Sequence, residues 1–265
     1  MVRFLFVGGM LVKRKELWMP LAVALLVIGL WEGCVRLFEV PLYILPAPSK
    51  IVQSMIANRE VLFMHTLVTL EEAVIGLAIA LALGMATAIL MDYSKTFRHS
   101  VYPHLVVSQT VPVMVLAPLF SIWLGFGMAP KVLIVIFMCY FPITISFADG
   151  LALVSQKQIN LLKSFQASTL QIYTMVKIPA AASSLFSGLK VATTYCVGGA
   201  IAGEWNSASA GLGYYMLRVK NGYMLDKVFA TVVVVVIVSL LLNGLVSLAK
   251  HWLCPHVNRQ RRSEQ

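Results

Sequence analysis

Residues 228–249 read VFATVVVVVIVSLLLNGLVSLA and contain no charged side chain. About 20 mostly apolar residues are enough to cross a hydrocarbon core of about 30 Å. The run of valines disfavours a helix in water, but in lipid a single helix satisfies its own backbone hydrogen bonds. The stretch is therefore predicted to be a membrane-spanning helix.

Five further stretches of the chain have the length and apolar character of a span. They are residues 17–38, 66–91, 100–125, 132–153 and 180–203. Together with residues 228–249, they predict an all-α, polytopic membrane protein with six transmembrane helices. We expect residues 17–250 to form one transmembrane domain, flanked by a tail over residues 1–16 and a basic tail over residues 251–265.

The composition excludes several classes of protein. Of the 265 residues, 59% are hydrophobic and 12% are charged, whereas soluble domains carry about 25% charged residues. The net charge of +10 reflects a shortage of acids, with 11 Asp and Glu against 21 Lys and Arg. The positive-inside bias of membrane proteins produces the same imbalance. A soluble enzyme, a disordered chain and a nucleic-acid binder are all disfavoured.

The basic residues also predict the orientation. With six spans, both termini share a side with two of the connecting loops. That side carries thirteen Lys and Arg and the opposite side seven, with Lys190 left inside a span. Because cytoplasmic loops are enriched in Lys and Arg, both termini are predicted to be cytoplasmic in a multi-pass protein of the inner membrane.

The segment between the first two predicted spans, residues 40–64, is expected on the outer surface. It contains three prolines and then an amphipathic stretch that starts at Ser49. Ser49 is a suitable N-cap, and Ile51, Val52 and Met55 would face apolar surroundings. The sequence thus predicts a short surface helix here.

Residues 154–179 form a long cytoplasmic connection with a pattern of its own. Ile159, Leu162 and Phe165 recur at helical spacing, and a second short pattern follows near Ile172. Ser168 or Thr169 would cap the second helix. Two short amphipathic helices are compatible with an interfacial position on lipid or with docking of a soluble partner.

This connection resembles the cytoplasmic loop of permease subunits of ATP-binding-cassette (ABC) importers. The family pattern is Glu-Ala-Ala, three residues, Gly, nine residues, Ile, any residue and Leu-Pro. At the same spacing this chain has Asn160-Leu161-Leu162, Gln166, Val176 and Ile178-Pro179. The resemblance implies an ATPase-coupling loop formed by Asn160, Leu161, Leu162, Lys163, Phe165, Gln166, Ala167, Ser168 and Pro179.

The chain departs from this pattern at two positions. Asn160 replaces the family Glu and Gln166 replaces the family Gly. Gly permits a positive φ at little cost, so Gln166 would be strained if the turn needs that conformation.

Other stretches support the same resemblance. They include residues 43–49 (YILPAPS), 110–112 (TVP), 123–127 (WLGFG) and 211–213 (GLG). The resemblance covers residue 43 to the C-terminus and is closest to the branch that takes up sulfonates, nitrate, taurine and thiamine precursors. In this branch, the chain corresponds to the binding-protein-dependent inner-membrane component.

The resemblance implies several partners for the chain. They are two copies of an ABC ATPase subunit, a second permease copy and an extracytoplasmic substrate-binding protein, all at the lipid bilayer and without nucleic acid. Whether the second copy is identical stays open. The sequence has no Gly-rich, Lys-containing phosphate loop, so ATP and Mg²⁺ are expected on the ATPase, and no enzymatic activity or cofactor is expected in this chain.

Polar and aromatic residues in the spans are candidates for a pathway or gate. Glu71 and Glu72 lie about 30 Å of helix before Asp92, which predicts an outer position, either solvated at the interface or at the rim of a pathway. Glu204 is expected near the same face. The remaining candidates are Pro112, Trp123, Tyr140, Lys190 and Tyr195.

Within this branch, residues 160–164 (NLLKS), 192–195 (ATTY) and 203–205 (GEW) most resemble permeases for the pyrimidine precursor of thiamine. The resemblance implies hydroxymethylpyrimidine or a related heteroaromatic compound as the substrate. The aromatic candidates would stack on a flat ring, although they are equally compatible with core or lipid-facing positions. Sulfonate, taurine or nitrate is the alternative within the branch. An ion-coupled secondary transporter is the alternative of another class, and it would need ion-coupling groups near the membrane midplane.

Overall fold

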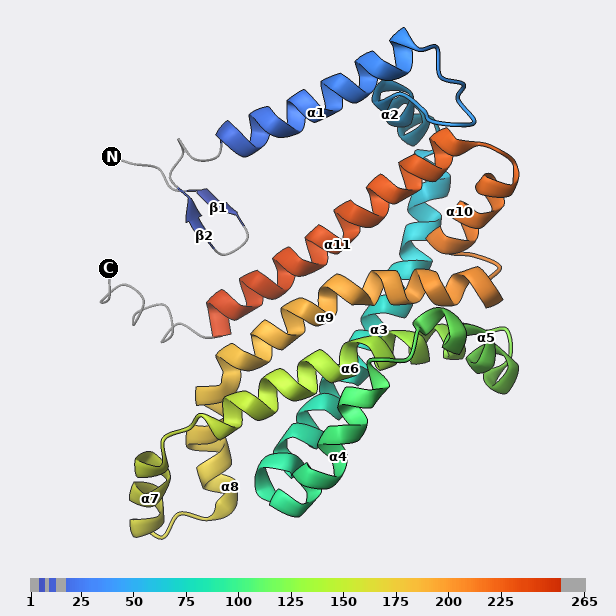
Figure 1. Ribbon diagram of the computed structural model, residues 1–265. Coiled ribbons are helices and arrows are strands. Elements are labelled where there is room, and N and C mark those ends of the chain that lie inside the picture. The colour runs from blue at the N-terminus through green and yellow to red at the C-terminus, as the bar shows by residue number, and fades with distance from the viewer. Residues whose placement is uncertain (1–4, 8–9, 13–17, 254–265) are drawn as a thin grey trace. The chain divides into compact units, whose positions relative to one another are not determined.

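A computed structural model describes residues 5–7, 10–12 and 18–253 of the chain (Figure 1). The chain divides into two compact units. The first comprises Met1–Thr69 and Ser209–Val238, and the second comprises Leu70–Ala208 and Ser239–Gln265. Two long helices, α3 (Arg59–Tyr93) and α11 (Leu225–Leu253), have residues in both units.

Helices long and apolar enough to cross a membrane confirm the predicted class. Within the described residues, five helices meet this condition, or six if one bent pair counts as a single span. The first span is α1 (Trp18–Leu37). A short antiparallel hairpin of β1 (Leu5–Val7) and β2 (Met10–Val12), with Leu5 opposite Val12, was not predicted.

In the first unit, α2 (Pro48–Ala57) forms where the surface helix was predicted, but its cap differs. The N-cap residue is Ala47, and Ser49 lies inside the first turn. Glu32 of α1 accepts hydrogen bonds from the Ser49 backbone N–H at 2.9 Å and from its hydroxyl at 2.7 Å. A carboxylate from another helix therefore satisfies the N-terminus of α2, as the helix dipole favours. Ile51 is buried as expected, whereas Val52 is half exposed.

The same unit holds α10 (Leu212–Asn221) against the first part of α3. Gly211 has a φ of 112°, which L side chains rarely adopt. Its N–H donates to His65 Nδ1 at 3.1 Å, and the Leu212 N–H donates to Thr69 Oγ1 at 2.8 Å. Side chains of α3 thus cap α10.

The second unit is centred on α6 (Met128–Ala152) and α9 (Ile178–Ser207), which lie side by side along most of their length (Figure 1). A Cβ on Gly188 of α9 would lie 2.5 Å from the carbonyl oxygen of Pro142. Small residues at helix contacts allow the backbones to approach this closely. In lipid, where no hydrophobic effect drives helices together, the resulting van der Waals packing holds them in contact.

The predicted third span, residues 100–125, is not one straight helix. It consists of α4 (Lys95–Ser108) and α5 (Val113–Leu124), bent by 102° at the break. Pro112 is the N-cap residue of α5. Because proline lacks an N–H and disfavours the helical conformation of the preceding residue, the break falls before it.

The connection at residues 154–179 folds as two helical segments, as predicted. The first is α7 (Gln156–Ser164). The second is α8 (Thr169–Ile172), which continues through a π-helical turn, η2 (Tyr173–Lys177), directly into α9. We call residues 154–179 the coupling loop.

Candidate functional site

The turn between α7 and α8 contains the strained position that the missing glycine suggested. Gln166 has a φ of 59°, in the left-handed region. Its N–H donates to the Lys163 carbonyl at 2.9 Å, and the Ala167 N–H donates to the Leu162 carbonyl at 3.0 Å. This pair of bonds is a Schellman motif, whose left-handed residue is usually glycine. Gln166 holds the turn at a cost of about 1–2 kcal/mol.

Ser168 closes the other side of the turn. Its hydroxyl accepts from the Gln171 N–H at 3.3 Å, and the Gln171 side chain accepts from the Ser168 N–H at 2.7 Å. This is a capping box, and it selects Ser168 over Thr169 as the cap. Since the end of α7 and the start of α8 are both satisfied, the two segments have a defined geometry.

The coupling loop exposes large apolar side chains. Phe165 is 75% exposed, Leu170 73% and Leu161 59%. Of the other residues predicted to contact an ATPase, Leu162 and Ala167 are half buried and Asn160, Lys163, Gln166, Ser168 and Pro179 are exposed. An apolar surface of this kind on a polar loop is typical of a protein interface.

A residue that was not predicted from the sequence attaches the coupling loop to α3. Asp92, in the last turn of α3, accepts from the Tyr173 hydroxyl and from Lys177 Nζ, each at 2.5 Å. The Lys177 and Asp92 side chains are 15% and 8% exposed. The spacing of four residues between Tyr173 and Lys177, which places both on one helix face, was the available signal.

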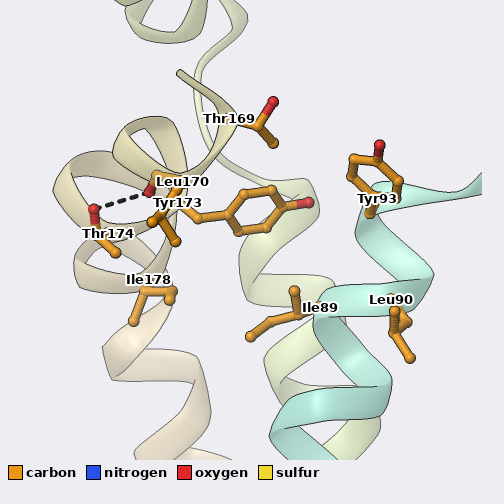
Figure 2. A pocket seen from close by; sticks show the side chains of 8 residues that line it. All are labelled: Ile89, Leu90, Tyr93, Thr169, Leu170, Tyr173, Thr174 and Ile178. Carbon is orange, nitrogen blue, oxygen red and sulfur yellow. Dashed lines mark hydrogen bonds between the residues drawn. The ribbon is translucent and has the colours of Figure 1, made fainter. Parts of the chain in front are cut away.

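An apolar cavity of about 310 Å³ lies beside this attachment. Figure 2 shows the Tyr173 ring extending from η2 toward the α3 side chains Ile89 and Tyr93. The rest of the wall is formed by Leu90 of α3, Thr169 and Leu170 of α8, Thr174 of η2 and Ile178 of α9. The coupling loop and the end of α3 therefore share both a polar contact and an apolar surface.

Far from the coupling loop, the structure brings together two of the predicted acids, Glu72 and Glu204, and Lys131. They lie in the first half of α3, near the end of α9 and near the start of α6. Lys131 Nζ of α6 donates to Glu72 Oε1 of α3 at 2.7 Å. Glu204 of α9 presents its carboxyl to Glu72. Glu72 and Glu204 are each 1% exposed and Lys131 6%, whereas Glu71 is exposed. Glu72 thus lies in a buried ion pair and is not a solvated residue of the interface.

The aromatic candidates do not converge on one site. Tyr140 shares a hydrogen bond of 2.8 Å with Thr87 and lines a cavity of about 280 Å³ between α3 and α6. Trp123, on α5, is 70% exposed, and Tyr195, on α9, is 48% exposed. Neither is among the residues that line this cavity. Of the remaining candidates, Pro112 marks the break before α5, and the Lys190 carbonyl accepts from Asn243 Nδ2 at 3.4 Å.

Comparison with known proteins places this architecture in a family. Residues 78–259 match the family described as binding-protein-dependent transport system inner membrane component. A probable ABC transporter permease protein of Haemophilus influenzae is 35% identical over 229 residues, 86% of this chain and 94% of that protein. The formylaminopyrimidine transport permease protein ThiX of Halalkalibacterium halodurans is 33% identical over 242 residues, 91% of this chain and 96% of that protein.

A solved structure agrees in fold. The crystal structure of an amino acid ABC transporter with histidines has a chain that superposes with a TM-score of 0.61 at 17% identity, covering 75% of this chain and 97% of that chain. The resemblance seen in the coupling loop is therefore confirmed along most of the sequence. The chain belongs to the binding-protein-dependent inner membrane components and is a multi-pass permease subunit of an ABC importer.

Proposed function

We propose that this permease subunit imports a pyrimidine precursor of thiamine, such as hydroxymethylpyrimidine, or a related heteroaromatic compound. The observation that carries the proposal is the 33% identity to ThiX, a formylaminopyrimidine transport permease, over 96% of that protein. A riboflavin transport permease, RibX of Chloroflexus aurantiacus, is 26% identical. The sulfonate permease SsuC of Bacillus subtilis and the taurine permease TauC of Escherichia coli are 27% and 25% identical.

The cavity at Tyr140 supports a ring-shaped, uncharged substrate. Its walls are Leu83, Leu133, Ile136 and Phe137, with hydroxyls from Thr87 and Tyr140. A flat heteroaromatic ring stacks favourably on aromatic side chains and uses one or two hydrogen bonds for orientation. A sulfonate or nitrate would instead require cationic or backbone N–H donors, and none of these six residues is a Lys or Arg.

Uptake by the assembled transporter tests the substrate. Labelled hydroxymethylpyrimidine, taurine and nitrate are offered to proteoliposomes that contain the permease, its ATPase and the binding protein. We expect ATP-dependent uptake of the pyrimidine alone. Tyr140→Phe, which removes the hydroxyl bonded to Thr87, is expected to reduce pyrimidine uptake, with exposed Tyr223→Phe as the matched control. Uptake of taurine or nitrate without the pyrimidine would replace the proposed substrate by the sulfonate-branch alternative.

The energy for import comes, in this proposal, from a partner. Two ATPase subunits bind ATP and Mg²⁺, and each docks on the coupling loop of one of two permease copies. The exposed Phe165, Leu161 and Leu170 provide the apolar contact, and the attachment at Asp92 transmits the motion to α3. An extracytoplasmic binding protein delivers the substrate. The excess of Lys and Arg supports cytoplasmic termini and a cytoplasmic coupling loop.

A matched pair of preparations tests this energy source. The purified permease alone is expected to hydrolyse no ATP, and the complete transporter is expected to hydrolyse ATP in step with uptake. ATP turnover by the permease free of its partner would contradict the assignment.

A further inference from the structure

Two side chains of α3 with different chemistry hold the first turn of α10. The Gly211 N–H donates to His65 Nδ1 at 3.1 Å, and the Leu212 N–H donates to Thr69 Oγ1 at 2.8 Å. Amides at the start of a helix have no acceptor within the helix itself. Gly211 and Leu212 are buried, so each bond satisfies an N–H that would otherwise be costly to bury.

The bond from Gly211 defines the protonation state of His65. A backbone N–H only donates, so Nδ1 accepts with its lone pair, and the neutral ring carries its proton on Nε2. An imidazolium has an N–H on both nitrogens, and its Nδ1 would face the Gly211 N–H as a second donor. The Thr69 hydroxyl does not titrate in this range, so the bond from Leu212 is independent of pH.

The surroundings of His65 provide no carboxylate that would replace the lost bond. The ring stacks on Tyr215 at a centroid distance of 5.2 Å, and none of the ion pairs among the described residues includes His65. The elements that pack in this cluster carry the titratable side chains Lys50 of α2, Arg59 and Glu60 of α3, Tyr214, Tyr215, Arg218 and Lys220 of α10, and Asp226 and Lys227 of α11. Among these side chains, cations outnumber acids by five to two.

We propose that His65 is an acid-sensitive latch that holds α10 on α3. In the closed state, the unprotonated Nδ1 accepts from the Gly211 N–H. When Nδ1 takes up a proton from water, this bond is lost and the first turn of α10 opens at Gly211, while Thr69 and the apolar contacts keep the helix attached. Because opening binds one proton, acid shifts the equilibrium toward the open state and a rise in pH shifts it toward the closed state.

The position of the latch gives it access to water. His65 is half buried and directly precedes the predicted span at residues 66–91. In the orientation proposed above, the latch responds to the extracytoplasmic pH, and only this choice of side rests on the proposed function. The hydrogen-bond chemistry of His65 depends on neither the orientation nor the substrate.

Amide hydrogen exchange at single-residue resolution tests the latch in the complete transporter in nanodiscs. Protection is expressed relative to the intrinsic exchange rate at each pH. Between about pH 8 and about pH 5, we expect the protection of the Gly211 amide to fall about fivefold or more, as the loss of one buried hydrogen bond predicts. The protection of the Leu212 amide, which Thr69 accepts, is expected to fall less.

Three variants separate titration from packing. In His65→Asn, the side-chain carbonyl oxygen takes the place of Nδ1 and accepts without titrating, so Gly211 is expected to stay protected at both pH values. Thr69→Val removes the acceptor that does not titrate and is expected to reduce the protection of Leu212 by the same factor at both pH values. His99→Asn is the control, because His99 Nδ1 lies 2.7 Å from the Lys95 carbonyl and therefore donates.

Nitrogen NMR of histidine-labelled protein provides an independent measurement. The His65 signals are identified as those that His65→Asn removes. At about pH 8 we expect an unprotonated Nδ1 and a protonated Nε2. Protonation of Nδ1 is expected over the same pH interval in which the Gly211 amide loses protection.

Three outcomes would overturn the proposal. One is the same pH dependence of Gly211 protection in the parent and in His65→Asn. Another is a protonated Nδ1 on His65 at about pH 8. The third is protonation of Nδ1 without any loss of protection at Gly211. A failure of pyrimidine uptake would leave all three measurements unaffected, so the latch and the proposed substrate are tested separately.

Discussion

Lys177 lies 85 residues after Asp92 in the sequence, yet its Nζ is 2.5 Å from the Asp92 Oδ2. The bond connects the π-helical turn before α9 to the last turn of α3. Because this turn belongs to the coupling loop, a displacement of the loop would reach α3 through this largely buried ion pair. If the loop couples the partner ATPase to the permease, as proposed above, this ion pair takes part in that coupling.

Asp92→Asn tests that role. The variant removes the charge that compensates Lys177 and weakens the bond from the Tyr173 hydroxyl. We expect uptake by the reconstituted transporter to fall by about fivefold or more, while the ATPase still co-purifies with the permease. Asp149→Asn is the control, since its partner Arg98 lies 3.4 Å away in a solvent-exposed pair and such pairs contribute little. Parental uptake in Asp92→Asn would contradict the role.

Gln166→Gly is predicted to stabilise the coupling loop. Glycine adopts the left-handed conformation at φ 59° without the steric cost that glutamine bears. A gain of about 1 kcal/mol in the turn would slow amide hydrogen exchange at residues 162–168 about fivefold. Gln166→Val, with a β-branched side chain, is expected to accelerate exchange at the same amides. Equal exchange in all three proteins would mean that the turn does not require this conformation in solution.

Ala167→Arg is predicted to weaken the association with the ATPase. Ala167 is half buried in the turn between the two loop segments, where a docked partner would approach closely, and a long charged side chain cannot enter a packed contact without loss. Co-purification of the ATPase with the tagged permease measures the effect. Asn221→Arg places the same side chain at an exposed position of α10 and is expected to behave like the parent. Normal ATPase recovery with Ala167→Arg would refute the docking assignment.

Gly203→Ala and Gly198→Ala form a matched pair within α9. The new methyl group at residue 203 would lie 2.9 Å from the Lys131 Cα, whereas a Cβ at residue 198 meets nothing within 4 Å. Gly203→Ala is expected to destabilise the protein by about 1–3 kcal/mol, seen as a lower melting temperature in nanodiscs. Gly198→Ala is expected to be neutral or slightly stabilising because alanine favours the helix. Similar melting temperatures for the two variants would show that α9 and α6 can separate at Lys131 without cost.

The features that could be predicted from the sequence are local ones. Apolar length alone predicts α1, α6 and α11 within a few residues. The cap of α8 is local as well, because Ser168 and Gln171, three residues later, form a capping box. The break before α5 was missed because hydropathy is continuous across Pro112, and proline also occurs inside unbroken helices, as Pro142 does in α6. The sequence pattern therefore cannot separate a kink from a bend of 102°.

The features that could not be predicted depend on contacts between distant residues. Glu72 and Lys131 are 59 residues apart, and their pairing follows from the rotation of α3 and α6 about their axes, which a single sequence does not specify. Glu71 and Glu72 look equivalent in the sequence, but neighbouring residues of a helix differ by about 100° in direction. Only one of the two can therefore face Lys131.

The π-helical turn η2 holds one residue more than a regular helix would, without changing the direction in which the coupling loop faces. A π turn needs about one residue more per turn than an α-helix, so its five residues rotate the chain by about as much as four α-helical residues, which turn by about 100° each. A single-residue deletion within Tyr173–Lys177 would therefore let α8 and α9 join as a regular helix and would leave Leu170 on nearly the same side. The same deletion inside α9 would rotate everything that precedes it by about 100°. The angular phase of the docking surface thus tolerates a change of length in η2 that it would not tolerate in α9.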